Sequence, residues 1–155
     1  MAPDYTATLP TKRTAAGVVF ADDTGRVLLV EPTYKPHWEL PGGTVERDES
    51  PHAAAAREVV EELGVVVTPG RLLVVDWVPP QGPRTEGVMF VFAGALPDPG
   101  TIRLPPDELR SWAWSSPEEA DARLSPLLAR RVRAALRARE TGSTIYLEAG
   151  EPVVG

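Results

Sequence analysis

Three glutamates near the middle of the chain have the types and spacing to bind a cation together. Glu58, Glu61 and Glu62 stand at i, i+3 and i+4, which on a helix places their side chains in one sector about 100° wide. Like charges at this spacing repel each other by roughly 0.2–0.5 kcal/mol per pair. The single neighbouring Arg57 cannot neutralise three acids. A hard divalent cation such as Mg²⁺ would, because it prefers oxygen ligands.

The sequence predicts that these glutamates lie on a helix over residues 51–63. Ser50 followed by Pro51 is typical of an N-cap and the first helical position, and the alanines at 53–56 favour a helix. Gly64 stands where a helix ends in a left-handed residue. The apolar face opposite the acids would consist of Ala56, Val59, Val60 and Leu63.

Two adjacent glycines, Gly42 and Gly43, precede the helix in what we expect to be a loop. Because glycine has no Cβ, backbone at these positions can closely approach a phosphate or a metal. Such a pair alone is typical of an ordinary turn, so its interpretation depends on the acids that follow.

The segment from Gly43 to Val65 follows the pattern G-x5-E-x7-REVVEELGV, in which the first glutamate is Glu49. It resembles the Nudix box of the Nudix hydrolases, the MutT-like enzymes, and matches every fixed position of that box. One flanking position departs, since many members have glycine where this chain has Asp48. The resemblance implies an α/β fold of the Nudix type, an α/β/α sandwich with a mixed β-sheet and the box helix on one side.

The resemblance also implies an activity. Nudix hydrolases use a divalent metal, Mg²⁺ or alternatively Mn²⁺, to cleave a phosphoanhydride (pyrophosphate) bond in a nucleoside diphosphate linked to another moiety. Candidate substrates are nucleoside triphosphates, ADP-ribose and nucleotide sugars. The alternative is a Nudix-fold nucleotide-binding or sensor module without turnover, but binding alone does not require three glutamates. A structural or interaction domain is a third interpretation.

Site residues follow from the box position by position. The metal ligands implied are the carboxylates of Glu58, Glu61 and Glu62 and the main-chain oxygen of Gly42. Arg57 and Glu49 would orient these acids without taking part in the chemistry themselves.

The base that activates water has two candidates. Family members place it either on a box glutamate, here Glu58, or on a later loop. Glu108 resembles the later acid because it lies six residues before Trp114 in the expected strand 111–115. Crowding of carboxylates raises the pKa of one of them toward a useful range for a base.

The sequence does not identify the substrate-binding site. Lys35 and Trp77 are candidates for contact with the substrate. The arginines of the C-terminal helix are compatible with nucleic-acid binding, but the net charge of −6 and the lack of interleaved aromatic residues favour a solvated helix face. These arginines are Arg130, Arg131, Arg133 and Arg137.

Composition limits the remaining function classes. The chain has 155 residues, which fits one domain, and no cysteine, which excludes disulfides and thiolate chemistry. No apolar run approaches the roughly 20 residues of a membrane span, and the N-terminus lacks a signal-peptide core. We therefore expect a cytoplasmic protein with a small-molecule nucleotide substrate and no nucleic-acid or membrane partner, and a homodimer is left open.

The order of the elements predicts a leader over 1–12, a single domain over 13–150 and a mobile tail over 151–155. Strands 15–20 and 26–31 are expected to pair as a hairpin, and 87–96 is expected to be a central strand. Further strands are expected at 38–40, 65–67, 72–78, 111–115 and 144–147, and further helices from 116 and over 126–139.

Overall fold

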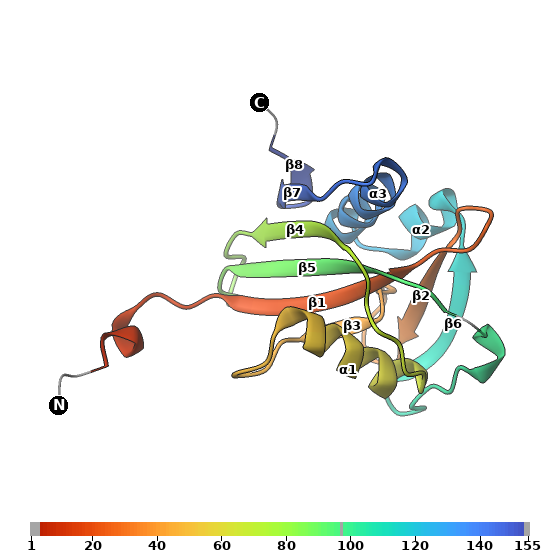
Figure 1. Cartoon of the computed structure of the whole chain (residues 1–155), viewed down its shortest axis with the longest axis horizontal. Helices are drawn as coiled ribbons and strands as arrows, with labels where there is room; N and C mark the ends of the chain where they lie inside the picture. Colours follow the sequence, from red (N-terminus) through yellow and green to blue (C-terminus); the bar gives the residue numbers. More distant parts are fainter. Residues whose placement is uncertain (1–3, 97, 154–155) are drawn as a thin grey trace.

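The computed structural model describes residues 4–96 and 98–153 and shows a mixed six-stranded sheet with helices on both faces (Figure 1). The strand order is β3-β1-β5-β4-β7-β8, in which β1 pairs parallel to β5 and β4 parallel to β7. The expected α/β/α arrangement is confirmed. The strands are β1 (Arg13–Phe20), β3 (Gly42–Thr44), β4 (Leu72–Val78), β5 (Gly87–Gly94), β7 (Ile145–Glu148) and β8 (Glu151–Pro152).

Three α-helices within the described residues cover this sheet and a smaller one. The helices are α1 (Pro51–Leu63), α2 (Pro117–Arg123) and α3 (Pro126–Thr141), with short 3-10 helices η1 (Tyr5–Thr8) and η2 (Pro99–Thr101). Each α-helix begins with Ser-Pro, and the serine hydroxyl accepts a hydrogen bond from a backbone N–H of the first turn. The smaller sheet pairs β2 (Val27–Pro32) with β6 (Leu109–Ser115).

The central strand β1 contributes to a hydrophobic core on each face of the sheet. Val18 and Phe20 belong to the core that includes Val59 and Leu63 of α1, whereas Val19 belongs to the core that includes α3. Figure 1 shows α1 on one side of the sheet and α3 on the other. Helix α1 is therefore fixed by its apolar side to the same strand, β1, that pairs with β3.

The predicted hairpin of strands 15–20 and 26–31 is wrong. The turn forms, with the carboxylate of Asp22 accepting from the backbone N–H groups of Thr24 and Arg26. Beyond a single bridge between Ala21 and Val27, however, the strands separate into different sheets. Strand β2 pairs instead with β6, far along the sequence, where its apolar residues are buried on both faces.

Several smaller expectations also change. The strand expected at 38–40 is a single bridge from Glu39 to Val30, and the glycines themselves form β3. Residues 65–67 are an irregular connection, and residues 151–152 of the expected mobile tail pair with β7. Part of the expected leader forms η1. Positions 1–3 and 154–155 of the leader and tail lie outside the described residues.

No helix within 4–96 or 98–153 combines the length and the apolar character that crossing a membrane requires.

Candidate active site

Strand β3 lies directly against the acidic side of α1 because two glycines allow it. Gly42 pairs with Gly17 of β1, and a Cβ at Gly42 would stand 2.3 Å from the carbonyl oxygen of Ala16. A Cβ at Gly43 would stand 2.6 Å from the carboxyl group of Glu58. Backbone therefore closes position 42 to a side chain, and at position 43 a side chain would displace the carboxyl of Glu58.

Arg57 is the centre of a charge network. Its Nε and Nη2 donate to the two oxygens of Glu49 at 2.8 and 3.0 Å, and Nη2 also donates to the carbonyl of Thr44 at 3.1 Å. Nη1 donates to Oε1 of Glu58 at 2.9 Å and to Oε1 of Glu61 at 3.2 Å. The hydrogen bonds from Arg57 hold the pKa of Glu49 down at about 2. Arg57 thus joins the loop, β3 and the acids of α1.

Glu62 is buried, which the helical-wheel argument did not predict. It is 7% exposed, and its Oε1 accepts a hydrogen bond of 2.6 Å from the backbone N–H of Gly42. Val60, expected on the apolar face, is 44% exposed. The helix is rotated so that the sector of Val59, Glu62 and Leu63 faces the sheet. Burial raises the pKa of Glu62 to about 8, and the neighbouring charge of Glu58 acts in the same direction.

Glu58 and Glu61 differ from Glu62 in their surroundings. Glu58 is half-buried, and burial raises the pKa of its carboxyl while the hydrogen bond from Arg57 opposes that shift. Glu61 is exposed. In the part of the chain that the structure describes, no three Asp, Glu, His or Cys side chains are arranged as they stand to hold a metal ion. Arg57 occupies the space between Glu58 and Glu61 instead.

Further charged groups surround Glu62. Glu108 is exposed on the turn before β6, and its negative charge contributes to the raised pKa of both Glu58 and Glu62. Glu39, which the sequence reasoning did not single out, has the same effect on Glu62. Lys35, a candidate for contact with the substrate, forms an ion pair with Glu39 and therefore lies beside the acids that surround Glu62. The only sequence signal for Glu39 was its position directly before the Leu40-Pro41-Gly42 turn into β3.

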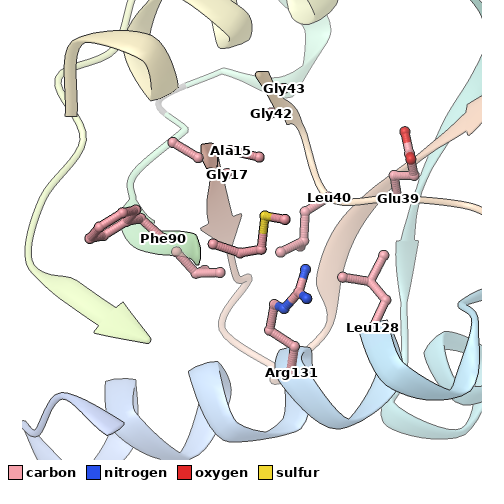
Figure 2. Close-up of a pocket in the computed structure, with 12 residues that line it drawn as sticks. Ala15, Gly17, Glu39, Leu40, Gly42, Gly43, Phe90, Leu128 and Arg131 are labelled. Atoms are coloured by element: carbon pink, nitrogen blue, oxygen red, sulfur yellow. The ribbon is translucent and has the colours of Figure 1, made fainter. Parts of the chain in front are cut away.

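A cavity of about 150 Å³ lies on the other side of the glycine strand (Figure 2). Gly42, Gly43 and Glu39 form the wall nearest the acids, and strands β1 and β5 contribute further residues. Leu40, Leu128 and Arg131 line the side toward α3. The cavity and the box glutamates therefore share β3 as a common wall.

Trp77 and Arg131 lie in surroundings that differ from those expected from the sequence. Trp77 does not line this cavity, and its Nε1 donates to Glu86 at 2.8 Å. Arg131, expected on a solvated helix face, lines the cavity and is only 13% exposed at its side chain. Its partner is the buried Asp76, an acid within the apolar strand β4 that required a cation nearby.

Asp48 supplies the physical reason for the glycine that many family members have at this position. Its backbone has φ of 61°, in the left-handed region that favours glycine and tolerates aspartate. The loop to Glu49 therefore keeps its left-handed residue although the glycine is absent.

The arrangement of a mixed sheet, a glycine strand and an acidic box helix defines a fold and site of the Nudix type. The family profile described as NUDIX domain matches residues 11–136. A MutT-like protein of Streptomyces ambofaciens is 35% identical over 121 residues, which cover 78% of this chain and 74% of that protein. An RNA pyrophosphohydrolase of Dinoroseobacter shibae is 32% identical over 136 residues, covering 76% and 84%. The chain belongs to the Nudix hydrolase family.

Solved structures agree with this assignment. A MutT Nudix hydrolase from Burkholderia pseudomallei has a TM-score of 0.68 at 27% identity and covers 83% of this chain and 98% of that one. A UDP-X diphosphatase has a TM-score of 0.74 at 21% identity, covering 92% and 70%, and at that identity the likeness concerns the fold alone.

Proposed function

We propose that the chain is a metal-dependent pyrophosphohydrolase that cleaves a phosphoanhydride bond in a nucleoside diphosphate linked to another moiety. The observation that carries this proposal is the position of Glu58 and Glu62 against the glycine strand β3, which is also a wall of the cavity, with Glu61 linked to Glu58 through Arg57. A binding module would not need this group of acids, of which Glu62 is buried, since crowded carboxylates cost stability when no cation offsets them.

The residues fit a divalent metal by their chemistry. Glu58, Glu61, Glu62 and the main-chain oxygen of Gly42 would hold Mg²⁺ or Mn²⁺, since all are oxygen donors. Glu62 supports this assignment because it is a buried carboxyl whose only hydrogen bond among the described residues comes from a backbone N–H. A bound ion would offset the charge of the phosphate oxygens and acidify a water molecule.

The chain's own residues would then position the metal-binding acids and remove a proton from the attacking water. Arg57 holds Glu49 through two hydrogen bonds and fixes Glu58 and Glu61 through Nη1, so it positions the acids. Glu58 or Glu108 takes the proton of the attacking water. Water forms a bond to phosphorus, and the bond to the bridging oxygen breaks, which releases two phosphorylated products.

The substrate set to test follows from the family and from the names of the relatives. It includes nucleoside triphosphates, ADP-ribose, nucleotide sugars and a short RNA with a 5′ triphosphate. Each is incubated with Mg²⁺, with Mn²⁺ or with EDTA, and products are separated by chromatography. We expect turnover of at least one substrate with metal and none with EDTA.

Variants test the assignment to the acids. Glu62→Gln should lower turnover at least about a hundredfold, because a lost ligand removes part of a several kcal/mol charge stabilisation. Glu140→Gln, which changes an exposed acid on α3, is the matched control and should keep full activity. Full activity in EDTA or in Glu62→Gln contradicts the proposal, and binding of nucleotides without any turnover indicates the sensor module.

A further inference from the structure

Arg131 and Asp76 form an ion pair that leaves most of the guanidinium without a protein partner. Arg131 Nε donates to Oδ2 of Asp76 at 2.7 Å, and Oδ1 of the fully buried Asp76 accepts from the backbone N–H of Gly150 at 3.1 Å. Arginine often binds a carboxylate with two parallel N–H groups. Here Nε alone is used within the described residues, so Nη1 and Nη2 remain free to bind something else.

The free part of the guanidinium faces the cavity. Arg131 lines that cavity, and its nitrogens point from α3 toward Leu40 and Gly17 (Figure 2). Its neighbours there are mainly apolar, among them Met89 and Leu128. A donor pair among apolar walls is the arrangement that fixes a ligand's orientation in small-molecule sites.

The charge of the pair indicates what kind of group it binds. Asp76 neutralises Arg131, so the pair attracts neutral hydrogen-bond acceptors more selectively than it attracts phosphate. Under the proposed function the phosphates lie at the opposite wall, where Gly42 and Gly43 adjoin the box glutamates. The cavity at Arg131 is therefore the place for the base of a nucleotide whose phosphates lie beside β3.

We propose that Arg131 is a specificity-determining residue that donates from Nη1 and Nη2 to the O6 and N7 atoms of a 6-oxopurine base. Guanine and hypoxanthine present these two acceptors side by side, a geometry that matches the arginine fork. Adenine has an N6 amino donor in place of O6, so it presents N7 alone on this edge. This inference deepens the proposed function, on which its choice of ligand rests.

The test measures binding of monophosphates, so that it does not depend on turnover. Calorimetry gives the Kd of GMP, AMP and 7-deaza-GMP, which lacks N7, for the whole chain. We expect GMP to bind roughly 10- to 100-fold more tightly than AMP, as one bidentate contact typically provides, and 7-deaza-GMP to fall between them.

The variants separate recognition from a structural role. Arg131→Gln alone leaves Asp76 buried without a cation and is expected to destabilise the fold. The double variant Asp76→Asn/Arg131→Gln removes both charges together and should fold, as checked by its thermal transition. In it the preference for GMP over AMP should disappear, with AMP affinity nearly unchanged. Arg133→Gln removes an exposed arginine of the same helix and should keep the preference.

Each result decides the question. Equal affinity for GMP and AMP in the unmodified chain, no measurable binding of either, or a preference that survives in the folded double variant overturns the role of Arg131. If the double variant does not fold, Arg131→Lys, which keeps the charge without the fork, must lose the preference for GMP over 7-deaza-GMP and AMP. Selective GMP binding without hydrolysis of any nucleotide would refute the proposed function and leave this inference intact.

Discussion

The buried carboxyl of Glu62 makes the metal-free chain sensitive to pH. Its pKa is about 8 in the fold, against 4.5 as the ordinary value, so the folded chain holds this proton more tightly than the unfolded chain. The corresponding stability is complete below about pH 4.5 and is lost as the pH rises through about 8. In EDTA, the Tm of the unmodified chain should therefore fall relative to that of Glu62→Gln between about pH 5 and 8.

Thermal melts of both chains in the same buffers measure this difference. Because only the difference between the two chains is compared, titration of the other groups largely cancels. A gap in Tm that stays constant over this range would show that Glu62 is not buried in its protonated form.

Arg57 acts through the groups it holds. Removing it in Arg57→Ala frees Glu49, Glu58 and Glu61, and we expect metal affinity and turnover to fall by about 10–100-fold. Mn²⁺ titration and steady-state rates measure the two effects. Arg57→Lys keeps the charge but not the two-bond contact with Glu49, so it should recover only part of the loss. Unfolding of Arg57→Ala would assign this residue a chiefly structural role.

The identity of the base can be settled by comparing two glutamates. If Glu108 takes the proton, Glu108→Gln should lower kcat about tenfold or more with little change in KM, because a base acts in the transition state. Glu58→Gln should lower it further, since a metal ligand is lost as well. The pH dependence of kcat for both variants and the unmodified chain is the measurement. An unchanged rate and pH profile in Glu108→Gln leaves Glu58, or another acid, as the base.

At the scale of elements, strand β3 contains two glycines, and a side chain is disfavoured at each for a different reason. In Gly42→Ala the new Cβ meets the backbone of β1, which cannot move without loss of pairing, so stability should fall by about 1–3 kcal/mol. In Gly43→Ala it meets the carboxyl of Glu58, which can rotate away. Gly43→Ala should therefore stay nearly as stable but lose about tenfold or more in turnover through misplacement of Glu58.

Urea unfolding and turnover of the same two preparations distinguish these cases. Equal losses of stability in both variants would contradict the difference in what the two glycines contact.

The same elements show what could be predicted from the sequence. Helix α1 was predicted with its correct bounds because Ser50, Pro51 and Gly64 are local signals that act within one turn. The pairing of β2 was not predicted, because its partner β6 lies some eighty positions away and no local signal specifies it. The burial of Glu62 was missed because helical periodicity assigns faces by polarity, and a buried acid violates that rule.

The cavity was missed for a similar reason. It is assembled from β1, β3, β5 and α3, which are separated in the sequence and come together only in the fold. One signal was available, since Asp76 stands within the apolar run LLVVDWV and a buried acid of this kind requires a positive partner.

At the scale of the whole molecule, Asp76 joins three parts of the chain: β4, α3 through Arg131, and the turn before β8 through Gly150. Asp76→Ala leaves Arg131 with an uncompensated charge in a mostly buried position. We expect the free energy of unfolding to fall by about 3–5 kcal/mol, measured in urea. The double variant Asp76→Asn/Arg131→Gln should lose much less, and a loss as large as that of Asp76→Ala would show that the packing of Asp76, not its charge, is decisive.

Helix α1 presents its apolar residues to the core and its acids to β3 from the same thirteen-residue element. Inserting one residue within it would rotate everything beyond the insertion by about 100°, so Leu63 would leave the core at the same moment as Glu62 leaves Gly42. Changes of length are thus excluded here, whereas the connection 79–86 between β4 and β5, which is exposed over residues 79–85, can accept them. Divergence among descendants of this chain should therefore proceed by substitution within 42–64 and by insertion or deletion at 79–86.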